Sequence, residues 1–150
     1  MRALIQRVKK ASVLINGSLH SEIGAGLLIF LGVTQSDNEE AAKYLAYRCA
    51  NLRIFEDNGG KMNLSVRDIS GSALVVSQVT LYADTRRGHR PSFTESAPPD
   101  LAERLYENFI RLLRTEIGEG NVFTGVFRAM MDISLVNDGP VTILVESKNH

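Results

Sequence analysis

The sequence predicts an α+β fold, in which a mostly antiparallel β-sheet packs against two main helices, and three observations support this class. Short apolar runs rich in β-branched residues occur near both ends of the chain, within residues 3–33 and 131–146. Two longer segments, residues 36–52 and 98–118, repeat their apolar residues at spacings of three and four, which is typical of helices. No repeat or linker divides the chain, so we expect one domain over residues 1–150.

The first third of the chain is predicted to form strands. Residues 3–8 and 12–15 are rich in aliphatic and β-branched side chains. Asn16-Gly17 follows directly and favours a type I′ hairpin turn. Residues 27–33 are apolar on both faces, which predicts a central strand covered on both sides.

The first helix is expected to begin near Ser36. Ser36 and Glu39 have the spacing of a capping box, with Ser36 as the N-cap. The expected buried stripe consists of Ala41, Leu45, Cys49 and Leu52. Cys49 lies on that stripe, so we interpret it as a small core residue rather than a nucleophile.

The middle of the chain leads to a polar segment. Residues 57–60 are predicted to form a turn and residues 61–72 to be irregular. Residues 73–76 then form a buried strand that ends in Ser77-Gln78-Val79-Thr80. Residues 83–98 have the composition of a long loop.

The last third combines a helix with a predicted hairpin. Pro98-Pro99-Asp100 opens the second helix, and Gly118 is its expected C-cap. Residues 131–136 and 141–146 are apolar runs on either side of Asp138-Gly139-Pro140. Because Asp-Gly favours tight turns, we expect these runs to pair as a hairpin.

Composition narrows the class of protein. Seventeen basic and seventeen acidic residues give no net charge, which argues against a broad nucleic-acid-binding surface but not against a local one. Cys49 is the only cysteine, so an intrachain disulfide is impossible, as suits a reducing compartment. The first residues lack the apolar core of a signal peptide, and residues 27–33 are too short to span a bilayer. We therefore expect a cytoplasmic protein.

The polar residues suggest a site without strong acid–base groups. The histidines His20, His89 and His150 offer no compelling general base, and no Cys or His cluster has metal-ligand spacing, so no metal or cofactor is expected. Thr80 is the best candidate hydroxyl, although an unactivated threonine is a weak nucleophile that also suits a strand. Ser77 and Gln78 can exchange hydrogen bonds without carrying charge.

Two motifs together resemble the D-aminoacyl-tRNA deacylase family. The family has a Ser-Gln-x-Thr motif and an Asn-x-Gly-Pro-Val-Thr motif about sixty residues apart, and they correspond here to residues 77–80 and 137–142. The resemblance implies a barrel-like sheet and a homodimer with its active site at the subunit interface. It also implies a hydrolase in translation quality control that cleaves the ester of D-aminoacyl-tRNA.

The resemblance further implies how such a site works. Thr80, with Ser77 and Gln78, would line the site and position the ester and a water, while the 2′-hydroxyl of the terminal adenosine assists the hydrolysis. Gly139-Pro140 would take a cis peptide bond, reach into the other subunit and reject L-aminoacyl esters. Glycyl-tRNA, having no side chain at its Cα, would then be a second substrate.

The sequence also contains a basic loop and two departures from the family pattern. Arg86, Arg87 and Arg90 lie within five residues that contain no acid, and they suit either a solvated loop or tRNA phosphate contacts. Val79, a candidate substrate-binding residue, replaces a phenylalanine that is usual in the family. Arg128 stands where the family commonly has glycine, and its cation would change the pocket rim or add a phosphate contact.

Two other functions remain open from the sequence. The first is a non-catalytic nucleic-acid-binding module that uses the Arg86–Arg90 loop. The second is an esterase in which Thr80 itself attacks small esters.

Overall fold

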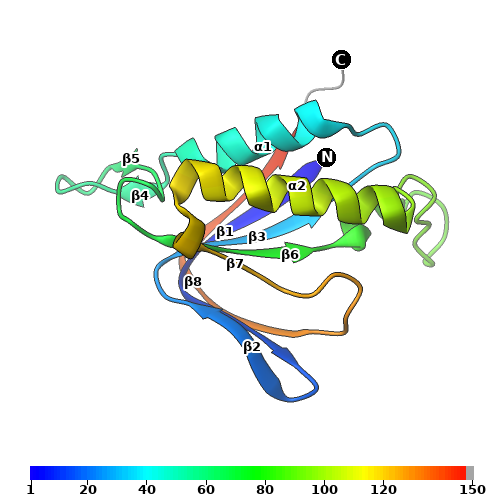
Figure 1. Ribbon diagram of the computed structural model, residues 1–150, viewed down its shortest axis with the longest axis horizontal. Helices are drawn as coiled ribbons and strands as arrows, with labels where there is room; N and C mark the ends of the chain where they lie inside the picture. The colour runs from blue at the N-terminus through cyan, green and yellow to red at the C-terminus, as the bar shows by residue number, and fades with distance from the viewer. Residues whose placement is uncertain (148–150) are drawn as a thin grey trace.

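The computed structural model describes residues 1–147 and shows a curled sheet beneath two helices (Figure 1). The main sheet has the order β2-β1-β3-β6-β7, and β8 also pairs with β1. Its strands are β1 (Arg2–Ile15), β2 (Ser18–Ile23), β3 (Gly26–Gly32), β6 (Ser72–Ser77), β7 (Val122–Thr124) and β8 (Asp132–Glu146). β1 pairs antiparallel with β2, β3 and β8, whereas β6 pairs parallel with β3 and β7. The predicted α+β class is confirmed.

The strands in the first third of the chain agree closely with those predicted from the sequence. The two predicted strands are one long β1, and Asn16 and Gly17 follow it with φ values of 52° and 77°, as a type I′ turn requires. β3 is central, as predicted, because it lies between β1 and β6 with both faces covered. Leu27 faces the core beneath the helices, and Leu28 faces a second core inside the curled sheet.

The curl brings distant strands of the sheet together. The second core joins Val8 and Val13 of β1 to Leu74 of β6. Ser21 Oγ on β2 donates a hydrogen bond of 2.8 Å to the Thr124 carbonyl on β7, so the two ends of the strand order meet. The sheet is therefore nearly closed, which agrees with the barrel-like fold that the resemblance implies.

The helices α1 (Glu39–Asn51) and α2 (Pro99–Ile117) pack side by side on one face of the sheet (Figure 1). α2 begins and ends as predicted, and Gly118 caps it with a φ of 107°. The predicted cap of α1 is wrong: Asn38, not Ser36, is the N-cap, and its side chain accepts a bond of 3.1 Å from the Ala41 N–H. None of the helices in residues 1–147 is long and apolar enough to cross a membrane.

Short elements complete the chain. β4 (Phe55–Glu56) and β5 (Met62–Leu64) form a small antiparallel ribbon within a segment that was expected to be partly irregular. β5 was missed because three residues carry too little periodicity to be recognised. The 3₁₀ helices are η1 (Val79–Tyr82) and η2 (Glu119–Asn121).

The predicted hairpin at the end of the chain is wrong. Residues 132–146 form one strand, β8, which pairs with β1 along nearly its whole length. Between the pairs Gln6–Thr142 and Val8–Asn137, the four residues 138–141 lie opposite Arg7 alone. Asp138-Gly139-Pro140 therefore forms a wide bulge in a continuous strand rather than a turn between two strands.

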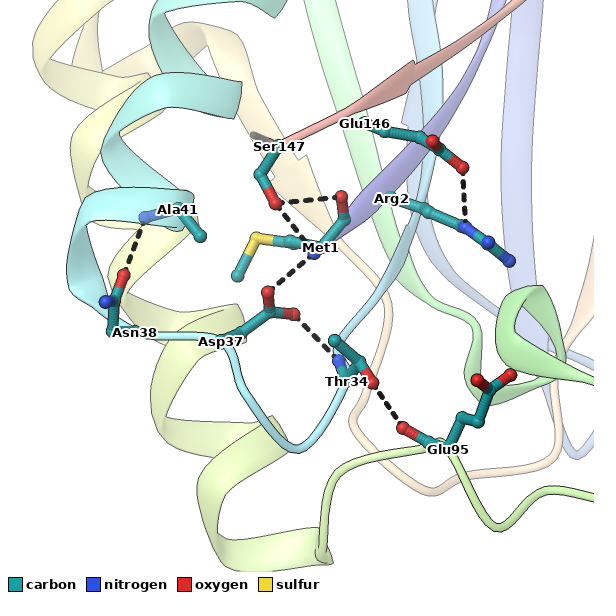
Figure 2. A network of polar contacts seen from close by, with 9 residues as sticks. All are labelled: Met1, Arg2, Thr34, Asp37, Asn38, Ala41, Glu95, Glu146 and Ser147. Carbon is teal, nitrogen blue, oxygen red and sulfur yellow. Dashed lines mark hydrogen bonds and ion pairs between the residues drawn. The ribbon is translucent and has the colours of Figure 1, made fainter. Parts of the chain in front are cut away.

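A polar network joins the first residue to the turn before α1 and to the residue after β8 (Figure 2). The Met1 ammonium forms a buried ion pair of 2.6 Å with Asp37 and donates to Ser147 Oγ. Asp37 in turn accepts from the Thr34 N–H at 2.7 Å, and Thr34 Oγ1 donates to the Glu95 carbonyl. The long loop before α2 is thus held against the ends of β1 and β8.

Candidate functional site

A pocket of about 470 Å³ lies at the carboxyl ends of the parallel strands β3 and β6. The apolar wall comes from these strands, from the start of α2 and from the loop between β7 and β8. Ser77, Gln78 and Val79 line the pocket where β6 ends, so the structure brings three of the predicted site residues together there. The size and apolar lining are typical of a small-molecule site.

The segment after β6 is ordered by short-range hydrogen bonds. The Gln78 backbone N–H continues the β3 pairing with a bond of 2.8 Å to the Leu31 carbonyl. Its side-chain amide then donates to Thr80 Oγ1. Thr80 is exposed beside the pocket, and this bond from Gln78 orients its hydroxyl.

Two side chains from outside the motif hold η1 in place. Arg2 Nη1 donates to the Leu81 carbonyl at 2.8 Å, and the Arg2 guanidinium carbon lies 4.4 Å from the centre of the Tyr82 ring. Arg2 Nε also pairs with Glu146 at 2.8 Å, as Figure 2 shows. From the other side, Ser96 Oγ donates to the Val79 carbonyl at 3.2 Å. These bonds restrict the turn that carries Val79 and Thr80.

The pocket has almost no ionisable groups. Among its lining residues in the described chain, Arg128 alone carries a charge. Burial raises the pKa of the nearby Tyr82 phenol, so Tyr82 stays neutral. His20 and His89 are exposed, and His150 lies outside the described residues. Residues 1–147 contain no group of three or more His, Cys, Asp or Glu placed to hold a metal ion.

The bulge in β8 is held by its own motif and by a buried arginine. Asn137 Oδ1 accepts from the Val141 N–H at 2.8 Å, and Asn137 Nδ2 donates to the Val141 carbonyl at 3.2 Å. Arg7, which is 6% exposed, donates to the carbonyls of Asp138 at 2.8 Å and Ile54 at 2.6 Å. Gly139 and Pro140 remain exposed, and the peptide bond between them is cis.

The bulge and the pocket are far apart within one chain. Ile133 lines the pocket, whereas Gly139 lies six residues further along the same strand. An extended strand rises about 3.3 Å per residue, so Ile133 and Gly139 are separated by roughly 20 Å. No residue of the bulge is among the described residues that line the pocket.

The basic loop does not present three equivalent arginines. Arg86 binds Asp84 through both Nε and Nη2, at 2.9 and 2.7 Å, and these bonds lower the pKa of the Asp84 carboxyl to about 2. Arg87 and Arg90 are exposed and have no ion pair with any described residue. Asp84 therefore partly offsets the charge of Arg86, whereas Arg87 and Arg90 have no such partner among the described residues.

Sequence reasoning missed several residues of the site. Phe127, Ala129 and Met131 form the far wall of the pocket from a loop without a periodic pattern. Arg7 could have been recognised from the sequence, because it follows Ala3 and Ile5 at alternate positions of one buried strand face. A buried charge on such a face indicates a partner nearby, and here the partners are Asp138 in the bulge and the Ile54 carbonyl.

Comparison with known proteins gives consistent results. A family model described as D-Tyr-tRNA(Tyr) deacylase matches residues 4–146. A Thermotoga petrophila protein named D-aminoacyl-tRNA deacylase is 58% identical over 147 residues, which cover 98% of this chain and 97% of the relative. A protein of the same name from Fervidobacterium nodosum is 54% identical and covers 99% of this chain and 98% of its own length.

Two solved structures have similar folds. One, described as a c-Myc DNA Unwinding Element Binding Protein, has a TM-score of 0.95 and 37% identity over 99% of this chain and all of that chain. The other, described as a probable eukaryotic D-amino acid tRNA deacylase, has a TM-score of 0.82 at 17% identity and covers 97% of this chain and 98% of its own. At that identity, the second likeness concerns the fold.

Proposed function

Because the chain belongs to the D-Tyr-tRNA(Tyr) deacylase family, we propose that it is an enzyme that hydrolyses the ester bond of D-aminoacyl-tRNA. The products are the free D-amino acid and tRNA. The observation that carries this proposal is the match over residues 4–146 together with relatives of the same name that align along their full length. Such an enzyme acts in translation quality control in the cytoplasm.

The neutral polar groups of the site favour substrate-assisted catalysis. Ser77, Gln78 and Thr80 are neutral hydrogen-bonding groups, and a site built from them lacks a strong general base. The 2′-hydroxyl of the terminal adenosine lies next to the ester that is cleaved and supplies the missing assistance. The protein then contributes by positioning the ester and the attacking water, which can lower the barrier by several kcal/mol. Backbone N–H groups near Thr80 stabilise the developing oxyanion.

Chiral selection is assigned to the exposed bulge. Rigid backbone carbonyls at Gly139-Pro140, placed near the substrate Cα, clash with an L side chain and leave room for a D side chain on the other side. Arg7 supports that rigidity through its bonds to Asp138 and Ile54. The same filter admits glycine, so mischarged glycyl-tRNA is a second substrate.

This filter requires a second copy of the chain. Gly139 lies roughly 20 Å along the strand from the pocket wall, which is too far for its carbonyl to meet a substrate bound at Ser77. In a homodimer, the bulge of one subunit completes the pocket of the other. Arg87 and Arg90 then contact phosphates of the acceptor stem, and the paired Arg86 contributes less.

The deciding experiment is paired hydrolysis of D-tyrosyl-tRNA and L-tyrosyl-tRNA by purified protein of known oligomeric state. We expect loss of the D ester while the L ester survives, and glycyl-tRNA should be cleaved as well. A D-tyrosyl-tRNA with a 2′-deoxy terminal adenosine tests the assistance and should react far more slowly. Survival of the D ester with folded, dimeric protein would refute the proposal.

A non-catalytic nucleic-acid-binding function is the second candidate, because one similar structure is described as a DNA-binding protein. Arg87 and Arg90 are exposed cations that suit it. It predicts salt-sensitive binding without turnover, independent of the aminoacyl group. A Thr80 esterase would be refuted if Thr80→Ala kept most of the activity, or if a substrate lacking the 2′-hydroxyl were inert with the wild type.

A further inference from the structure

Arg128 adopts a backbone conformation that is unfavourable for arginine. Its φ is 68°, in the left-handed region that L side chains rarely occupy and that glycine occupies freely. The Arg128 guanidinium forms no hydrogen bond with another described residue that would compensate for this conformation. The side chain is exposed, so burial of its stem does not explain it either.

The position of Arg128 links it to the pocket. Arg128 lies in the loop between β7 and β8, which in Figure 1 extends toward the side of the molecule where β6 ends. Arg128 lines the same pocket as Ser77 and Val79, and among the described lining residues it is the only charged one. An exposed residue that also lines a pocket lies at the rim. Its cation has no acidic partner in residues 1–147, unlike Arg86 and Arg2.

We propose that Arg128 binds the phosphodiester on the 5′ side of the substrate's terminal adenosine. This inference rests on the proposed function, since it concerns the same pocket and the same RNA. With the reacting ester at Ser77 and the nucleoside against the apolar wall, the chain of the RNA must leave through the rim, where Arg128 lies. A guanidinium suits this role because its planar fork can donate two hydrogen bonds to one phosphate.

The test is binding of an RNA hairpin that ends in CCA and carries no amino acid. Its affinity is measured as a function of potassium chloride concentration. Arg128→Gln should weaken binding roughly tenfold at moderate salt and lower the salt slope by about one, because one phosphate contact is lost. Arg48→Gln is the matched control, since Arg48 is an exposed arginine on α1 that does not line the pocket. It should leave both quantities unchanged.

Arg128→Gly separates substrate binding from a structural role. Glycine relieves the left-handed backbone, so the melting temperature should stay equal or rise while the RNA affinity and salt slope fall as in Arg128→Gln. With D-tyrosyl-tRNA, the loss should appear mainly in KM, because a phosphate contact is made equally in the ground and transition states. Arg128→Lys should restore the salt slope but only part of the affinity.

Two results would overturn the inference. One is unchanged affinity and salt slope in both Arg128→Gln and Arg128→Gly, and the other is an equal loss in Arg48→Gln. The proposed function fails in a different way: wild-type protein would bind the hairpin with the Arg128-dependent slope and yet cleave neither tyrosyl ester.

Discussion

Substitution of Gly139 by alanine tests whether the bulge sets chirality. A Cβ at Gly139 would lie 2.8 Å from Val141 Cγ2 and 2.9 Å from the Val141 nitrogen, closer than real Cβ atoms approach such neighbours. It would also lie 3.3 Å from Nη2 of Arg7, whose Nε donates to the Asp138 carbonyl of the bulge. The φ of Gly139 is 148°, which alanine avoids, so the backbone must move.

The size of the effect follows from these contacts. Left-handed backbone alone costs a non-glycine residue about 1–2 kcal/mol, and displacement of the crowded backbone raises the loss to about 2–4 kcal/mol. For a chain of this length, that corresponds to a melting temperature lower by roughly 5–15 °C. Gly60→Ala is the matched control, because Gly60 has a φ of 78° and open space around its Cα. It should show only the smaller cost.

The assay is the ratio of kcat/KM for D-tyrosyl-tRNA to that for L-tyrosyl-tRNA, measured well below the melting temperature. We expect the ratio to fall at least tenfold in Gly139→Ala, equivalent to about 1.4 kcal/mol of lost discrimination, and to stay constant in Gly60→Ala. A destabilised Gly139→Ala enzyme with the wild-type ratio would show that the bulge carbonyls do not select chirality.

Three further predictions concern residues around the site and core. Arg2→Lys keeps a cation but loses the planar guanidinium that contacts Leu81, Tyr82 and Glu146. We therefore expect kcat to fall about tenfold while KM stays nearly constant. An unchanged kcat would contradict a positioning role for Arg2. Asp37→Asn leaves the buried Met1 ammonium unpaired and should lower the free energy of unfolding in urea by about 3–5 kcal/mol; a loss under about 1 kcal/mol would argue against that burial. Burial raises the pKa of the Cys49 thiol to about 12 from 9.0, so the unfolded chain loses this proton first as the pH rises. Stability should therefore decline above about pH 9 relative to Cys49→Ala, and parallel profiles for the two proteins would refute this.

Local signals in the sequence predicted the elements whose causes are local. Asn16-Gly17 forms its turn because both residues tolerate positive φ, and α2 ends where Gly118 takes a φ of 107°. Ser77 was placed at the end of a buried strand because an apolar run stops there. The first of the two family motifs likewise indicated Ser77 and Gln78, which line the pocket.

Long-range contacts decided the elements that were predicted wrongly. Asp138-Gly139 is a strong local turn signal, but β1 pairs with residues on both sides of it, and Arg7 holds the intervening bulge. Asn38 replaces Ser36 as the cap of α1 beside Asp37, whose side chain is fixed by the distant Met1 ammonium. No periodicity could reveal that residues 127–131 form a pocket wall, because they have no regular structure of their own.

On the proposed function, charged side chains and backbone geometry have separate roles at this site. A D-aminoacyl-tRNA and its L counterpart carry identical phosphates, so the proposed contacts of Arg128 and Arg87 would raise affinity for both equally. Discrimination must come from groups that meet the Cα, and within one chain the bulge lies roughly 20 Å from the pocket wall. On the proposed dimeric arrangement, a dissociated subunit keeps its cations and its pocket but loses the filter. Affinity for tRNA would then be a property of one chain, whereas chiral selection would depend on subunit association.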